Sequence, residues 1–253
     1  MKRWAVLAGL LLLLGVALAV YFADTPAARE IRGLLLPGPF DTVVIDAGHG
    51  GRDPGALAGG LVEKNLALDL ALRLRRKLEA RGVEVVMTRD DDTFLTLDER
   101  TRIAARAGNA IMVSLHFNKA PSAEARGVET FFHDPDYPEE FPALSEAADL
   151  PPRAATESEL LASAIHAEVS AATGALDRGI KNHPYFVVRN AKVPSVLVEG
   201  GFMSHPFEAR MIANGGYRDI LARAIADGIM EYRSLQAPES SARLAHKSSS
   251  ASP

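Results

Sequence analysis

Residues 42–51 have the sequence Thr-Val-Val-Ile-Asp-Ala-Gly-His-Gly-Gly. The β-branched run that opens this stretch, closed by a polar residue and glycines, is typical of a short buried strand. The strand is expected to end at Asp46, which places His49 in the first turn after it. Parallel α/β sheets bind their ligands beyond the carboxyl ends of the strands. The stretch therefore predicts an α/β fold with a candidate site residue at His49.

Strand and helix patterns alternate through the rest of the chain. Leucines at 66, 70, 74 and 78 recur every four residues, which predicts a helix over 63–81. Further helices are expected over 96–108, 157–173, 205–213 and 217–234, and further strands over 83–88, 110–115, 127–133, 185–188 and 195–198. This alternation predicts one α/β domain built on a mostly parallel central sheet.

The composition narrows the chemistry. Cysteine is absent from the 253 residues, so disulfides and thiolate metal ligands are excluded, and any metal must be held by nitrogen and oxygen. The formal net charge is -4 and no long basic run occurs. We therefore expect no nucleic-acid partner.

The N-terminus has the pattern of an export signal. Lys2 and Arg3 precede an uninterrupted apolar stretch over 4–23. This stretch has the length of about 20 residues that a bilayer span requires, so residues 1–23 are expected to be a cleaved signal peptide or an uncleaved signal anchor. Both alternatives place the rest of the chain outside the cytoplasmic membrane, in the periplasm or facing the cell wall. The uncleaved form would also tether it to the membrane.

Composition also sets the limits of the domain. Three prolines mark residues 24–40 as a linker, the folded domain is expected over 41–235, and the Ser- and Ala-rich residues 236–253 predict a disordered tail. Residues 134–156 form an acidic, proline-rich insert, for which a solvated surface loop and a lid over a substrate groove are both open interpretations.

Four titratable residues stand where such a domain binds ligands. His49 and His116 follow the ends of two strands, Glu199 ends a third, and Glu63 begins the first helix. Two histidines and one carboxylate with an open fourth position are the donor set of a catalytic zinc site. A second carboxylate next to it can serve as general base.

Each of these residues also has an ordinary structural explanation. Histidines at strand ends are usually hydrogen-bonding residues, and Glu63 would be favoured in a first helical turn by the helix dipole. The apolar strand before Glu199 indicates a shielded carboxylate, which is costly unless it is paired or bound to metal. The residues alone therefore leave a metal hydrolase and structural roles both open.

Ordered similarity to a known family adds to this interpretation. The chain resembles the zinc-dependent N-acetylmuramoyl-L-alanine amidases of the type 3 family from about residue 42 to 234. Four segments resemble successive motifs of that family: 43–56, 63–66, 114–118 and 198–204. Two further stretches, 127–131 and 177–181, also match. One such motif alone would be weak, but four in the correct order are specific.

The resemblance implies a role for each residue of the constellation. Zinc would be bound by His49, Glu63 and His116, and Glu199 would move a proton from water to the leaving amine. The substrate implied is peptidoglycan, cut at the amide between N-acetylmuramic acid and L-alanine. The fold implied is a twisted six-stranded sheet with helices on both faces. Whether an activator protein is needed stays open.

Other roles stay as alternatives. Asn118 and Arg178 could bind substrate, although a turn cap and a structural ion pair explain them equally well. Asp46 could orient His49 or cap backbone. The remaining histidines match no ligand position of the motifs. Two alternative functions are a zinc peptidase or amidohydrolase acting on another envelope peptide, and a non-catalytic cell-wall binding module.

Overall fold

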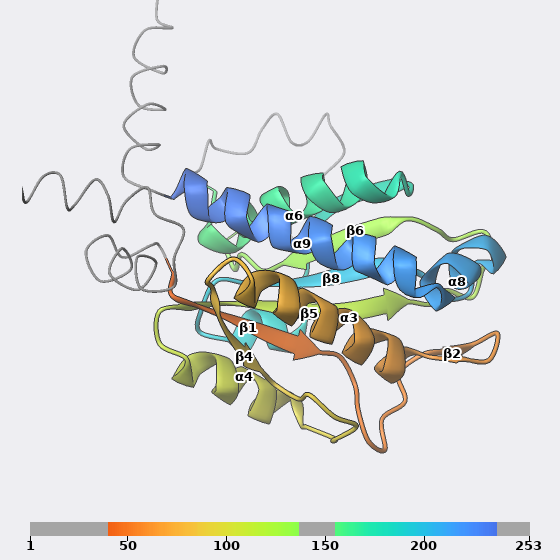
Figure 1. Ribbon diagram of the computed structural model, residues 1–253, viewed down its shortest axis with the longest axis horizontal. Helices are drawn as coiled ribbons and strands as arrows, with labels where there is room; N and C mark the ends of the chain where they lie inside the picture. Colours follow the sequence, from red (N-terminus) through yellow and green to blue (C-terminus); the bar gives the residue numbers. More distant parts are fainter. Residues whose placement is uncertain (1–39, 137–154, 237–253) are drawn as a thin grey trace, which may run out of the picture.

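A six-stranded sheet is the centre of the domain that the computed structural model describes over residues 40–136 and 155–236 (Figure 1). Its strand order is β4-β1-β5-β8-β6-β7, and every neighbouring pair is parallel except β6 with β8. The strands are β1 Thr42–Ala47, β4 Glu84–Met87, β5 Ala110–Asn118, β6 Val128–Phe132, β7 Asp177–Asn182 and β8 Ser195–Phe202. The prediction of a mostly parallel six-stranded sheet is confirmed.

Helices cover both faces of the sheet, but unequally. One face carries three long helices: α3 Glu63–Glu79, α6 Glu157–Thr173 and α9 Gly215–Leu235. The other carries two shorter ones, α4 Leu97–Arg106 and α7 Phe186–Asn190. Helix α8, Pro206–Ala213, follows the end of β8. The prediction of helices on both faces is confirmed, and the thinner cover lies on the α4/α7 face.

Alternation along the strands decides which side chains face each layer. Val43 and Ile45 belong to the cluster under the long helices, whereas Val44 belongs to the cluster under α4 and α7. The same alternation in β5 and β8 puts His116 and Glu199 on the α4/α7 side. The thinly covered face is thus the one that receives the chemically reactive side chains.

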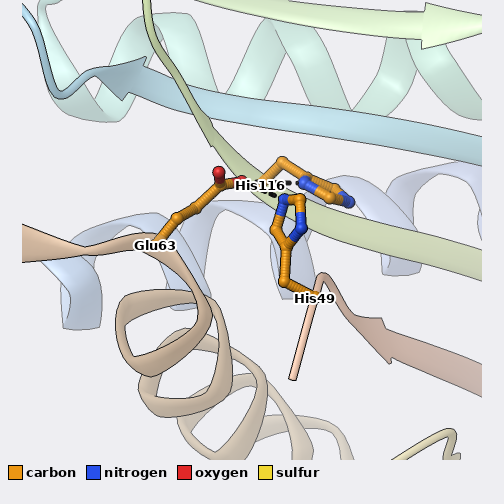
Figure 2. Close-up of side chains that lie close together, drawn as sticks. All are labelled: His49, Glu63 and His116. Atoms are coloured by element: carbon orange, nitrogen blue, oxygen red, sulfur yellow. Dashed lines mark hydrogen bonds and ion pairs between the residues drawn. The ribbon is translucent and has the colours of Figure 1, made fainter. Parts of the chain in front are cut away.

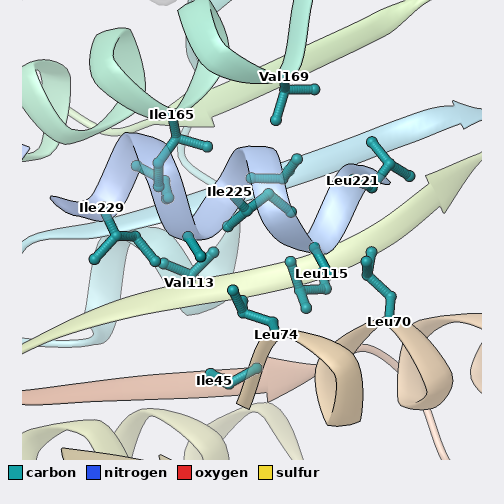
Figure 3. Close-up of a cluster of buried hydrophobic side chains, with 14 of the residues drawn as sticks. Ile45, Leu70, Leu74, Val113, Leu115, Ile165, Val169, Leu221, Ile225 and Ile229 are labelled. Atoms are coloured by element: carbon teal, nitrogen blue, oxygen red, sulfur yellow. The ribbon is translucent and has the colours of Figure 1, made fainter. Parts of the chain in front are cut away.

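The larger core is packed by aliphatic side chains from both helices and strands. Leu70 and Leu74 of α3 are fully buried, as the four-residue leucine spacing predicts, and they lie in one cluster with Leu115 and Ile225 (Figure 3). Each such side chain contributes about 1.5–3 kcal/mol when it is removed from water. This core holds β1, β5 and β8 in the register on which the site depends.

Several elements differ from the sequence expectation. The prediction of a strand over 185–188 is wrong, because residues 186–188 lie in helix α7 and residue 185 is its N-cap. The sixth strand of the sheet is β7. β7 is a largely polar edge strand, so it lacks the apolar alternation that identifies strands. A short hairpin of β2 Leu57–Ala58 and β3 Leu61–Val62 was also not expected. Helix α3 ends at Glu79, two residues before the end predicted at residue 81.

Several sequence predictions fall outside the described residues. These are the signal segment 1–23, the linker 24–40 up to Pro39, residues 137–154 of the acidic insert, and the tail 236–253 after Gln236. Among the helices that the structure describes, none combines the length and the apolar character needed to cross a bilayer.

The contact between α6 and α9 gives a stability test. A methyl group added at Gly228 would overlap Cα of Ile165 and lie 2.7 Å from the carbonyl oxygen of Ala164. We expect Gly228→Ala to lower the free energy of unfolding by about 1–3 kcal/mol, although alanine is the better helix former by about 1 kcal/mol. Urea denaturation would measure the change. As a control, Gly216→Ala meets only the Asn214 side chain, and equal effects of both substitutions would contradict the packing argument.

Candidate active site

A pocket of about 600 Å³ opens at the carboxyl ends of β1, β5 and β8. Its floor includes the four residues singled out in the sequence. Its walls come from residues 94–97, which lead into α4, and residues 185–187, which enter α7. The pocket therefore lies beyond the carboxyl ends of the strands, where α/β folds place their ligands, and on the side of the sheet that α4 and α7 cover.

Three donor side chains converge in this pocket (Figure 2). Nε2 of His49 lies 3.1 Å from Oε1 of Glu63, and Nδ1 of His116 lies 2.8 Å from the same oxygen. The two imidazole rings meet edge to face with centroids 4.8 Å apart. The structure thus brings together side chains from β5, the start of α3 and the turn after β1.

Glu63 is held firmly in this arrangement. Its Oε2 accepts a hydrogen bond of 2.8 Å from the backbone N–H of Ala56, and Oε1 accepts one of 3.2 Å from that of Phe117. Burial raises the pKa of Glu63, but hydrogen bonds from His116 and His49 outweigh it, so the pKa falls well below its ordinary value. Glu63 is therefore an ionised carboxylate with a fixed orientation.

The orientation of the His49 ring is fixed by Asp53. Nδ1 of His49 lies 2.8 Å from Oδ2 of Asp53, while Oδ1 of Asp53 accepts a hydrogen bond of 3.1 Å from the N–H of Gly55. Burial lowers the pKa of His49, but hydrogen bonds and charges of Glu63 and Asp53 raise it above its ordinary value. The ring accordingly presents Nε2 to Glu63, whereas His116 presents Nδ1.

The donor set fits a zinc ion. The three donor atoms all lie within 4.8 Å of one another, as atoms bonded to one ion at about 2.0–2.2 Å must. The backbone around them leaves no space for extra side chains, because a Cβ at Gly48 would overlap the His116 ring and one at Gly55 would lie 2.7 Å from Oε2 of Glu63. Two imidazoles and one carboxylate are ligands that zinc commonly takes.

Glu199 lies next to these donors. It pairs in register with His116 of β5 on one side and with Glu129 of β6 on the other. Its Oε2 is buried and has no hydrogen-bond partner among the described residues. Burial raises the pKa of Glu199 well above its ordinary value, and the charges of Glu63 and Glu129 raise it further. A carboxyl group in this environment can both accept and release a proton.

Glu129 organises two residues that the sequence suggested as substrate ligands. Asn118 donates a hydrogen bond of 2.6 Å to Oε1 of Glu129, and Nε of Arg178 donates one of 2.7 Å to Oε2. Lys181 also pairs with Oε2. Asn118 lines the pocket, whereas Arg178 does not. The structural ion pair proposed for Arg178 is thus present, and contact of either residue with substrate stays a prediction.

The hypothesis that Asp46 orients the His49 ring is wrong, since Asp53 has that position. Both oxygens of Asp46 are occupied, by Thr88 and Arg100 on one side and Ser114 on the other. Burial opposes ionisation of Asp46, but these partners keep its pKa below the ordinary 3.8.

Two buried arginines hold the turn that carries His49. Arg89 donates to the carbonyl oxygens of Ala47 and Gly48, at 2.9 and 2.6 Å. Arg100 donates to those of Ala47 and His49, at 2.7 and 2.5 Å. Asp46 therefore acts on the turn indirectly, through Arg100. This support stabilises His49 in a left-handed conformation, with φ of 59°, that non-glycine residues seldom adopt.

The six-stranded α/β fold carries a pocket whose donor set suits a metal-dependent hydrolase, and the comparisons with known proteins specify the family. A family model described as N-acetylmuramoyl-L-alanine amidase matches residues 43–231. The chain belongs to this family.

Individual relatives agree with the assignment. N-acetylmuramoyl-L-alanine amidase LytC of Bacillus subtilis (strain 168) is 36% identical over 211 residues, covering 83% of this chain and 39% of LytC. The catalytic domain of CwlV, an N-acetylmuramoyl-L-alanine amidase from Bacillus (Paenibacillus) polymyxa var. colistinus, superposes with a TM-score of 0.66 at 33% identity, covering 76% of this chain and 98% of that one. The N-acetylmuramoyl-L-alanine amidase of Clostridium difficile 630 gives 0.67 at 31%, covering 77% and 97%.

The buried Asp46–Arg100 pair predicts a pH-dependent stability. Asp46→Asn leaves the Arg100 charge without its carboxylate, so we expect a loss of about 3–5 kcal/mol in the free energy of unfolding at pH 7. Because the pKa of Asp46 is lowered on folding, its contribution is present above 3.8 and is lost as the pH falls through the lower value. Denaturation at several pH values should show the two proteins converging in acid. A difference that does not shrink in acid would contradict this account.

Proposed function

We propose that the protein is a zinc-dependent amidase that hydrolyses the bond between N-acetylmuramic acid and L-alanine in peptidoglycan. Membership of the N-acetylmuramoyl-L-alanine amidase family supports the amide bond and the substrate. The observation that carries the metal chemistry is the convergence of His49, Glu63 and His116 within 4.8 Å. These three side chains would hold the zinc ion.

The other residues of the pocket account for the proton transfers. Bound zinc would supply Lewis-acid activation of the scissile carbonyl and of the attacking water. Glu199 accepts the proton that the water loses as its oxygen attacks the carbonyl carbon. The same carboxyl group then delivers that proton to the nitrogen of L-alanine, and the C–N bond breaks. Its unpartnered Oε2 and raised pKa support this double role.

Peptidoglycan lies outside the cytoplasmic membrane, which agrees with the export signal expected over residues 1–23. We propose a periplasmic or cell-wall location, with a membrane tether if the signal stays uncleaved. A zinc peptidase would share the metal site and differ in its products. A non-catalytic wall-binding module would not need a Glu199 whose buried Oε2 lacks a hydrogen-bond partner within residues 40–136 and 155–236.

Glu199→Gln tests the proposed reaction. The amide keeps the shape of the side chain but cannot accept a proton, so we expect kcat to fall at least about 100-fold while one zinc ion per chain is retained. The measurement is mass spectrometry of digested peptidoglycan together with metal analysis of the protein. The wild type should release peptides that begin with L-alanine and leave an intact lactyl-muramic acid.

The control is Glu124→Gln, which changes an exposed acid outside the pocket and should leave activity unaltered. Cleavage between two amino acids would instead favour the zinc peptidase. Wall binding without any cleavage by the wild type would favour the binding module.

Asp53→Asn tests the metal site without relying on turnover. Because the Asp53 carboxylate orients the His49 ring, we expect its replacement to weaken zinc affinity about 10–100-fold. Titration of the metal-free protein with zinc against a competing chelator would measure this. Asp90→Asn is the matched control, since Asp90 is an exposed acid outside the pocket. Unaltered zinc binding in Asp53→Asn would remove Asp53 from the metal site.

A further inference from the structure

Cations close to the pocket are almost all engaged by carboxylates within the described residues. Arg100 is paired with Asp46, and Lys64 with Asp92 at 2.7 Å. The two cations behind Glu199, Arg178 and Lys181, share Glu129. These side chains are held by the protein itself and offer little charge to a ligand.

Lys119 is different. It lines the pocket and is exposed, and its ammonium group has no carboxylate partner in residues 40–136 and 155–236. Its backbone is fixed, because its N–H donates a hydrogen bond of 2.8 Å to Oδ1 of Asn118, which is itself anchored on Glu129. Lys119 therefore has a positioned backbone and lies in the pocket lining, and no carboxylate of the described residues pairs with it.

Apart from Arg100, which is paired with Asp46, the other titratable groups that line the pocket are carboxyl groups, two histidines and a tyrosine. Asp53 and Glu63 line it as ionised carboxylates; Glu63 would bind the zinc ion, and Asp53 holds the His49 ring. An anionic group of a substrate would be repelled by these acids and attracted by the metal or by an unpaired cation of the lining such as Lys119. The chemistry that fits Lys119 is therefore a carboxylate placed some distance from the scissile bond.

We propose that Lys119 binds the free α-carboxylate of the second stem residue of peptidoglycan, a glutamate linked through its side chain; this inference rests on the proposed amidase function. Two residues of extended peptide span about 7 Å, which separates this carboxylate from the scissile carbonyl. Lys119 is three residues beyond His116 in sequence, so the Cα atoms of these two residues are at most about 10 Å apart. The length of the lysine side chain can cover part of this distance. Lys119 thus selects stems in which this carboxylate is ionised.

The test compares two substrates and three proteins, and a fourth protein, Lys119→Arg, serves as the rescue variant. The substrates are a muramoyl peptide with the free α-carboxylate and the same peptide with that group amidated. The proteins are the wild type, Lys119→Gln, and the control Lys192→Gln, which changes an exposed lysine outside the pocket. We expect Lys119→Gln to raise KM about tenfold on the free acid with kcat within about twofold, since one charge-assisted hydrogen bond is lost.

On the amidated peptide Lys119→Gln should match the wild type, and Lys119→Arg should restore most of the lost affinity on the free acid. Equal losses on both substrates, or no loss on either, would overturn the carboxylate assignment while leaving the amidase function intact. If the wild type cleaves neither peptide, the proposed function fails and this inference fails with it.

Discussion

The carboxylate of Glu63 is the interaction on which the site depends. One of its oxygens faces Nε2 of His49 and Nδ1 of His116, while backbone N–H groups of Ala56 and Phe117 keep the carboxylate from rotating. This negative charge stabilises the close approach of the two partly buried imidazole rings, whose centroids lie 4.8 Å apart. The glycine-rich turn, the hairpin before α3 and the end of β5 are all arranged around it. Metal binding would exploit an arrangement that the fold already stabilises.

Strand register extends this arrangement across the sheet. Because β8 lies between β5 and β6, Glu199 falls in one row with His116 and Glu129 on the same face. Arg178 and Lys181 compensate the charge of Glu129 but do not pair with Glu199. Two carboxyl groups in neighbouring positions therefore have contrasting environments: Glu129 is ionised and paired, whereas the buried Oε2 of the half-buried Glu199 has no hydrogen-bond partner in the part of the chain that the structure describes. Different environments of this kind give two neighbouring acids different pKa values, so that one acid serves a structural role and the other can transfer protons.

The sequence predicts the elements that have strong periodicity or clear ends. The leucine spacing of α3 and the apolar runs of β1, β5 and β8 give most of the fold, and the strand ends locate His49, His116 and Glu199. Partners set by tertiary contact are not visible in this way. Asp53 is only four residues from His49, and no spacing rule favours it over Asp46. Glu129 and Lys119 are brought near the site by strand register and loop geometry, and β7 escapes detection because an edge strand needs no apolar alternation.

Because helices cover the two faces of the sheet unequally, the residues that stabilise the domain are largely different from those that form the pocket walls. The long helices α3, α6 and α9 bury the larger core, whereas the pocket walls are formed by residues 94–97 and 185–187 on the other side. Changes in these wall segments would not disturb the leucine and isoleucine packing that stabilises the domain. Related proteins can therefore differ in the substrates that their pockets accept while they keep the same helices and sheet. The same division makes the two short segments natural targets for directed evolution.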